Sequence, residues 1–239
     1  MNLRTGNCLQ ANSWICGKFI TTREHQLTAA LQQHVVLTVE SVLIALAISL
    51  PLAIAVRRSR HATGGLLGLA TAIYAVPSLA LFGVLVPITG LRPATVLVGL
   101  ALYSLTILIR SVLTGLESVP PDVVEAARGM GMGRARLLLR VELPLALPSI
   151  FAGLRVATVS TVALATIGYL IGEGGLGNLI AEGLTNYFKA EVLTASVLCV
   201  ALAVAFDVVL VGLQRAVTPW TRTRTRTRTR PERVVGRSS

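Results

Sequence analysis

The polar residues that could carry chemistry are few, and three of them interrupt long apolar runs. Asp207, Arg110 and Arg155 each lie inside a stretch that is otherwise free of charge. A charged side chain in such a run is costly to place in hydrocarbon, so it usually faces water or an opposite charge. We expect Asp207 to form a structural ion pair with Arg155 or Arg110. Substrate binding by these residues is the alternative interpretation.

A membrane-embedded enzyme would require nucleophiles, bases or metal ligands that converge within the apolar runs. His25, His34 and His61 lie outside these runs or at their edges, and no run contains a pair of carboxylates. The three cysteines form no CxxC motif and have no histidine cluster nearby, so they provide no metal or redox motif. The sequence therefore predicts no catalytic residue, no metal and no cofactor.

The glycine-rich segment GEGGLG, at Gly172–Gly177, superficially resembles a phosphate-binding loop. It follows an apolar run rather than a strand, and the chain has no GxxxxGK[ST] motif. We therefore do not expect this chain to hydrolyse ATP.

The composition is typical of a membrane protein. The chain has 239 residues, of which 53% are hydrophobic and 14% charged, and its mean hydropathy is +0.71. An average globular chain is roughly 25% charged. The apolar residues form runs of about twenty, the length that crosses roughly 30 Å of hydrocarbon as a helix. These features predict an all-α integral membrane protein.

Five membrane spans are predicted from the long apolar runs. Pro77, inside the second span, frees a backbone carbonyl and should kink the helix. The predicted spans cover about 35–56, 64–88, 94–116, 149–172 and 192–213.

The distribution of basic residues predicts the orientation. Outside the spans, fifteen Lys and Arg residues fall on one side and five on the other. This places the N-terminus outside and the C-terminus in the cytoplasm. We expect an extracytoplasmic segment at 1–34, a transmembrane domain at 35–214 and a basic cytoplasmic tail at 215–239, disordered because its Thr-Arg repeat repels itself.

The net charge of +11 comes mainly from that tail, which contains eight arginines and one glutamate. Nucleic-acid binding would combine such basicity with stacking aromatic residues. Aromatic residues are only 5% of the chain, and none interleaves with the basic segment apart from Trp220 at its start. Nucleic acid is therefore excluded as a partner, whereas the lipid bilayer is an expected one.

The longest cytoplasmic loop, at about 117–147, predicts a helix–turn–helix. Pro120, Pro121 and Asp122 start a short helix, because proline and an acid suit a first helical turn. Glycines follow at 129, 131 and 133, and a second amphipathic stretch covers Arg134–Val141. Pro144 and Pro148 should then break the chain before the fourth span. Such a piece could bind in a groove of another protein, although a solvated loop is the alternative.

The same loop resembles the EAA motif, EAA-x3-G-x9-I-x-LP, of permease subunits of bacterial ABC importers. The matching residues have the right spacing, with valine in place of isoleucine, and they are Glu125, Ala126, Ala127, Gly131, Val141, Leu143 and Pro144. The resemblance implies that this loop is the coupling helix, which docks in a cleft of a separate ATPase subunit. Small alanines would allow close approach, and Gly131 would provide the turn.

Three longer stretches resemble the permeases of osmoprotectant importers, which carry glycine betaine, carnitine, choline or proline betaine. They are Ile73–Gly83, Glu125–Arg155 and Ile171–Ile180, and the similarity covers about Gln33–Gln214. Permeases of methionine importers are the nearest alternative, and a stand-alone secondary transporter or channel is an alternative of another class.

This resemblance implies a bacterial inner-membrane protein with several partners: ABC ATPase subunits, an extracytoplasmic substrate-binding protein, and a second permease subunit. Whether that second subunit is identical, and which substrate is carried, stay open.

Candidate pathway residues are Pro77, Ser78, Tyr103 and Tyr169. A proline break can line a pathway, and aromatic faces attract a quaternary ammonium group. Gly172–Gly177 is interpreted as a flexible, re-entrant turn that faces the binding protein, with an ordinary loop as the alternative.

Overall fold

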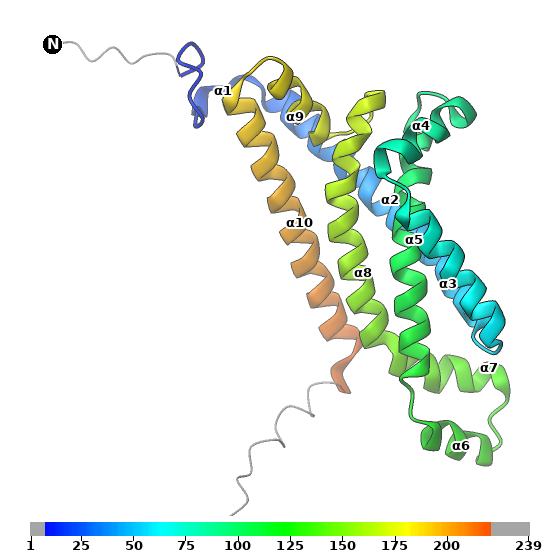
Figure 1. Cartoon of the computed structure of the whole chain (residues 1–239). Helices are drawn as coiled ribbons and strands as arrows, with labels where there is room; N and C mark the ends of the chain where they lie inside the picture. The colour runs from blue at the N-terminus through cyan, green and yellow to red at the C-terminus, as the bar shows by residue number, and fades with distance from the viewer. Residues whose placement is uncertain (1–7, 221–239) are drawn as a thin grey trace, which may run out of the picture.

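The computed structural model describes residues 8–220, and this part of the chain is helical and contains no strand (Figure 1). The all-α prediction is confirmed. The helices are α1 (Gly17–Thr22), α2 (Glu24–Val56), α3 (Arg60–Ala75), α4 (Ser78–Thr89), α5 (Pro93–Glu117), α6 (Pro121–Gly129), α7 (Arg134–Leu137), the π-helical turn η1 (Leu138–Glu142), α8 (Leu143–Ala165), the 3-10 helix η2 (Thr166–Ile171), α9 (Leu176–Thr185) and α10 (Lys189–Val217).

Four helical stretches are long and apolar enough to cross a membrane: α2, α5, Arg134–Ile171 and α10. A fifth crossing is available if α3 and α4 together form one broken span. The third and fifth predicted spans agree closely with α5 and α10. The first helix begins earlier than predicted, at Glu24 rather than near Val35, and ends at Val56 as expected.

The second predicted span is broken rather than kinked, because α3 and α4 meet at an angle of 96°. Val76 is extended, with φ −66° and ψ 126°, and Pro77 begins the next element. A residue before proline is pushed away from helical geometry by the proline ring. The Tyr103 hydroxyl of α5 donates a hydrogen bond to the Val76 carbonyl, which satisfies an acceptor that the break exposes.

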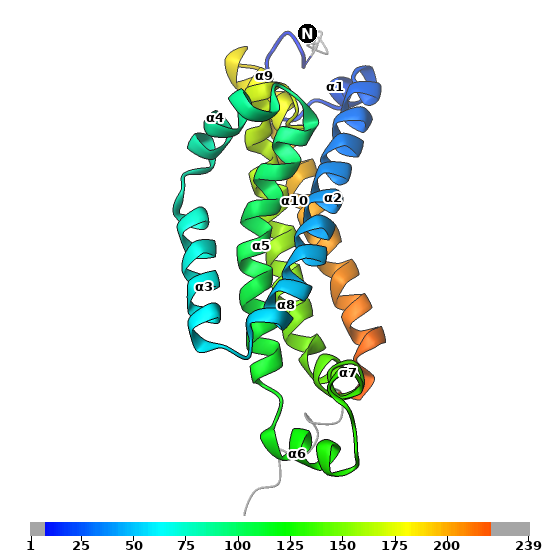
Figure 2. The ribbon, with the colours of Figure 1, turned by 90° about the vertical axis from the view of Figure 1, so that its right-hand side faces the viewer.

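The prediction that Pro144 and Pro148 separate the loop from the fourth span is wrong. Helical structure runs from Arg134 to Ile171, with Pro144 in the first turn of α8 and Pro148 inside it. The π-helical turn η1 joins α7 to α8, and such turns mark bends in helices. Figure 1 shows α7 lying across the end of the bundle, and Figure 2 shows it end-on.

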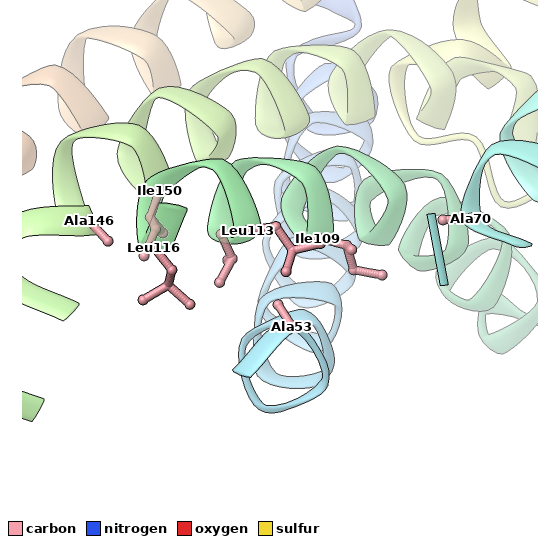
Figure 3. Packing of buried hydrophobic residues seen from close by; sticks show 8 residues of the cluster. Ala53, Ala70, Ile109, Leu113, Leu116, Ala146 and Ile150 are labelled. Carbon is pink, nitrogen blue, oxygen red and sulfur yellow. The ribbon is translucent and has the colours of Figure 1, made fainter. Parts of the chain in front are cut away.

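The core is organised around α5, which packs against α2, α3, α4 and α8. The cluster in Figure 3 combines side chains from all of these helices except α4, and its buried members are Ala53, Ala70, Ile109, Val112, Leu113, Leu116, Ala146 and Ile150. Burial of this apolar surface fixes the relative positions of the spans. By contrast, α10 contacts mainly α8 and α9, and its buried residues lie near its beginning.

Residues 8–22 form a small cap at the end of the bundle that carries α1 and α9, opposite α6 and α7 (Figures 1 and 2). A disulfide joins Cys8 to Cys16, a pairing that the cysteine spacing did not predict. The Asn12 amide donates to the Tyr187 carbonyl at 2.8 Å, and Phe19 packs edge-on against Phe188. These contacts tie the cap to the α9–α10 connection. The Thr-Arg repeat at 221–230 lies outside the described residues.

Candidate functional site

The EAA segment forms α6, a short helix at the end of the bundle away from the cap (Figure 2). Pro121 occupies the first turn together with Asp122, and Arg128 lies in the last turn. The acid and the base therefore complement the partial charges at the two ends of the helix. The predicted helix start at Pro120–Asp122 agrees with this geometry.

Gly131 ends α6 in a left-handed conformation, with φ +79°. The Gly131 amide donates to the Arg128 carbonyl at 2.9 Å, and the Met132 amide donates to the Ala127 carbonyl at 3.2 Å. This pair of bonds is the Schellman pattern, in which a glycine after the helix satisfies its last carbonyls. The glycine of the motif is thus required by the backbone rather than by a side-chain contact.

We expect Gly131→Ala to weaken docking of the ATPase by roughly fivefold or more, because a left-handed alanine costs about 1–2 kcal/mol. Gly133→Ala is the matched control, since Gly133 has φ −66° and open space around its missing side chain. Co-purification of the ATPase subunit at graded concentrations measures the effect. Equal binding by the two variants would contradict a role for the left-handed turn.

The side chains of the EAA triplet face different surroundings. Glu125 and Ala126 are exposed, and Glu125 has no ion pair or side-chain hydrogen bond within residues 8–220. Ala127 is only 2% exposed, so its methyl group packs against the chain itself. Glu125 and Ala126 therefore form the accessible part of the triplet, and the partner contact implied for Ala127 stays a prediction.

The second half of the motif lies at the start of the fourth span. Val141 belongs to η1, and Leu143 and Pro144 begin α8; all three are half-buried. These residues connect the coupling loop to a transmembrane helix.

An ion pair that the sequence did not reveal holds this connection. Arg57, at the end of α2, donates to a Glu142 carboxylate oxygen at 2.6 Å, and both side chains are largely buried. The two residues are 85 positions apart, and neither lies at a matching position of the motif. A charge-assisted hydrogen bond in a poorly solvated place fixes α2 against η1.

The structure brings Arg155 and Asp207 together between α8 and α10. Arg155 Nε lies 2.7 Å from Asp207 Oδ1, and Nη2 lies 2.9 Å from Oδ2, in a bidentate arrangement. Arg110 does not join them, because its Nη2 donates to the Thr71 hydroxyl at 2.5 Å and so connects α5 to α3.

We expect Asp207→Asn to lower the unfolding temperature in detergent by several degrees, because it leaves Arg155 without its carboxylate inside a span. Exchange of the two charges, in the variant R155D/D207R, should recover part of the loss. Arg110→Gln is the control, since it removes a span arginine that has no carboxylate partner in the described chain. Unchanged stability of Asp207→Asn would contradict a structural role for the pair.

The candidate pathway residues fall into two groups. Tyr103 is buried, and its ring packs edge-on against Tyr74, so in this structure it supports the break at Pro77–Ser78. Tyr169 of η2 is 44% exposed and lines a pocket of about 230 Å³ between η2 and α9. The structure does not bring Tyr103 and Tyr169 into one cluster of aromatic contacts.

The glycine-rich segment is held by side chains rather than free. Gln33 Nε2 donates to a Glu173 carboxylate oxygen at 2.6 Å, and the Asn178 amide donates to the Gly172 carbonyl at 2.8 Å. These hydrogen bonds hold the turn between η2 and α9 in this structure, and its flexibility stays a prediction. Gly177 belongs to the first turn of α9.

His34 is the clearest residue that the sequence reasoning misplaced. It lies inside α2 with 0% exposure, not at the edge of a span. Its Nδ1 lies 3.2 Å from the Gly174 carbonyl oxygen, and its Nε2 lies 3.0 Å from the Val162 carbonyl oxygen. The ring therefore links α2, α8 and the glycine-rich turn. No local pattern signals this, because its partners are 128 and 140 residues away.

Comparison with known proteins places this geometry in a family. The family described as "Binding-protein-dependent transport system inner membrane component" matches residues 45–223. The chain therefore belongs to this family of membrane components of transport systems, and it is a multi-pass inner-membrane protein.

Curated relatives match over most of the chain. The choline transport system permease protein OpuBB of Bacillus subtilis (strain 168) is 31% identical over 202 residues, which cover 84% of this chain and 93% of OpuBB. The glycine betaine/carnitine/choline permease OpuCD of the same strain is 37% identical, covering 78% of this chain and 82% of OpuCD. The osmoprotectant import permease OsmW of Salmonella typhimurium is 36% identical, and the match covers 78% of this chain and 89% of OsmW.

Solved structures share the fold at lower identity. An inward-facing structure of the MetNI methionine ABC transporter has a chain with TM-score 0.74 and 22% identity, covering 82% of this chain and 98% of that one. A chain of an amino acid ABC transporter solved with histidines has a TM-score of 0.70 and 18% sequence identity. The match covers 83% of this chain and 97% of that one. These matches establish a common arrangement of helices.

Proposed function

We propose that this chain is the permease subunit of an ATP-driven importer for osmoprotectants with a quaternary ammonium group, such as glycine betaine, carnitine, choline or proline betaine. The observation that carries the proposal is the exposed EAA helix α6, with Glu125 free to meet a partner, in a chain 30–37% identical to permeases whose names specify glycine betaine, carnitine or choline. The methionine and amino-acid transporters are less than 25% identical and support the fold alone.

The energy source in this proposal is a separate ATPase subunit that binds α6. The helical path from α7 through η1 into α8 offers a mechanical route, because displacement of α6 is transmitted to a helix that packs along α5. Two permease subunits would form the pathway between them. The largely unburied α10 leaves apolar surface for lipid or for that second subunit.

In the proposed orientation, the N-terminal cap lies outside and the coupling loop in the cytoplasm. The Cys8–Cys16 disulfide supports this arrangement, because disulfides persist in oxidising compartments and are rare in the cytosol. The disulfide supports this orientation independently of the count of basic residues. The α9 end of the bundle would then face the substrate-binding protein.

The proposed pathway contacts are Pro77 and Ser78 at the broken span and Tyr169 beside the outer pocket. Tyr169 is aromatic and accessible, as cation–π contact with a quaternary ammonium requires. Tyr103 acts in this proposal as a support for the break.

Uptake by proteoliposomes tests the proposal. The chain is reconstituted with its ATPase subunit and binding protein, and ATP-dependent uptake of radiolabelled glycine betaine, choline and methionine is compared. Uptake of a quaternary ammonium compound without uptake of methionine is expected. ATP-dependent uptake of methionine alone would replace the proposed substrate class, and ATP-independent uptake by the chain alone would overturn the permease assignment.

A further inference from the structure

A charged cavity lies between the coupling loop and the ends of the spans. It has a volume of about 710 Å³ and is lined by residues from the α2–α3 turn, the end of α5 and both arms of the loop. In Figures 1 and 2, α7 lies beside the end of the bundle while α6 projects beyond it. The cavity therefore lies at the end of the helical bundle that carries α6 and α7.

The charges around this cavity are unbalanced. Arg57 and Glu142 neutralise each other in their ion pair. Three other arginines, Arg58, Arg128 and Arg134, face the remaining carboxylate, Glu117. None of these three guanidinium groups is within ion-pair distance of a carboxylate in residues 8–220. Clustered, unpaired positive charges in a concave site favour an anion.

A second cavity, of about 300 Å³, adjoins the first and shares Arg57, Arg58 and Arg134 with it. Its other lining residues are apolar: Ile54 and Ala55 from the last turn of α2, Ala135 from α7 and Leu138 from η1. Arginines thus separate a polar compartment from an apolar one. An anion without an apolar part would use only the first compartment.

We propose that these two cavities bind one anionic phospholipid. Arg58, Arg128 and Arg134 hold its phosphate group, and the start of an acyl chain lies along Ile54 and Leu138. Basic pockets between membrane helices on the cytoplasmic side are suited to such headgroups. The site goes beyond transport itself, and its placement in the cytoplasmic leaflet follows the proposed orientation.

The three arginines lie on different elements, so a lipid that binds all of them affects how the loop moves. Arg128 lies in α6 and Arg134 in α7, on either side of the Gly131 turn, whereas Arg58 follows the first span. A phosphate shared by all three bridges the coupling helix to α2. The bound lipid therefore stiffens the loop on which the ATPase acts.

Native mass spectrometry of the detergent-purified full chain tests the site directly, using phosphatidylglycerol and phosphatidylcholine with the same acyl chains. Wild type should retain phosphatidylglycerol preferentially. The variant R58Q/R134Q should lose retention by roughly tenfold or more, because each arginine near an anionic lipid contributes about fivefold. Arg136→Gln is the matched control: it lies on the same helix α7, is exposed and lines neither cavity. It should change retention less than twofold, within the scatter expected for an uninvolved surface residue.

Several results would overturn the proposal. They are undiminished retention by R58Q/R134Q, an equal loss in Arg136→Gln, equal retention of phosphatidylcholine, or displacement of the lipid by inorganic phosphate at millimolar concentration. The last result would identify a free anion as the ligand. R58K/R134K, which keeps the charges, should retain lipid binding. It is the variant to measure if R58Q/R134Q does not fold.

This measurement needs no transport, so its failure is distinct from failure of the proposed function. In proteoliposomes with the ATPase and binding protein, uptake by wild type and Arg136→Gln should rise with the phosphatidylglycerol fraction. R58Q/R134Q should respond little. An identical lipid response in all three would contradict the link between the lipid and coupling.

Discussion

Glu125→Lys is expected to lower ATP-dependent uptake by at least about tenfold and to abolish co-purification of the ATPase subunit. Glu125 is exposed on α6 and makes no ion pair within the described chain, so its charge is available to a partner. Reversal of that charge in an interface creates repulsion where attraction was present. Because the Glu125 side chain makes no ion pair or hydrogen bond within residues 8–220, the variant should still fold.

The matched control is Glu24→Lys, the same charge reversal at an exposed position at the other end of the molecule. It should co-purify with the ATPase as wild type does. The unfolding temperature of each variant in detergent shows whether the chain remains intact. If Glu125→Lys binds the ATPase normally, α6 is not the coupling element and the permease assignment loses its main physical support.

Gly177→Ala is expected to destabilise the outer end of the bundle by about 1–3 kcal/mol, the usual cost of overpacking. A Cβ atom at this position would lie 2.2 Å from the Thr166 carbonyl oxygen and 2.5 Å from the Thr166 Cα. Both atoms belong to the backbone of η2, so no side-chain rotation relieves the clash. The variant must move α9 away from η2.

Gly212→Ala provides the control, because it is also a helical glycine but has no atom within 4 Å of its missing Cβ. Alanine is the better helix former, so this variant should be neutral or slightly more stable. Thermal unfolding followed by size-exclusion chromatography measures both. We also expect binding of the substrate-binding protein to fall in Gly177→Ala alone. A Gly177→Ala protein as stable as Gly212→Ala would show that α9 does not pack this closely.

The features that could be predicted from the sequence are those written in local patterns. Apolar runs predicted the span at α5 to within one residue at each end and the span at α10 to within four, because crossing hydrocarbon imposes a length and a composition. Prolines and glycines predicted the start of α6 and a stop in the segment Gly129–Gly133, where α6 ends at Gly129 and Gly131 forms the left-handed turn after it. The EAA spacing indicated the family, and the match over residues 45–223 confirmed it.

The errors arose at prolines, where a tertiary contact or a neighbouring turn changed the effect expected from the local sequence. Pro77 was expected to kink a span, and the chain instead breaks by 96°, with Tyr103 supplying the donor that a free carbonyl requires. Pro148 was expected to stop a helix, but the helix continues through it after the π-helical turn. Local propensity identifies the positions where a proline removes a helical hydrogen bond. It does not show how the rest of the fold compensates for that loss.

A helical membrane protein with a helix–turn–helix loop could be predicted from the sequence alone, because hydropathy and turn chemistry act over neighbouring residues. Which polar groups meet depends on how the helices pack: Arg155 pairs with Asp207 whereas Arg110 does not, Arg57 pairs with Glu142, and His34 lies against the carbonyls of Val162 and Gly174. These pairs are separated by 52 to 140 residues. A buried polar group needs a partner, but helix packing selects that partner from every span.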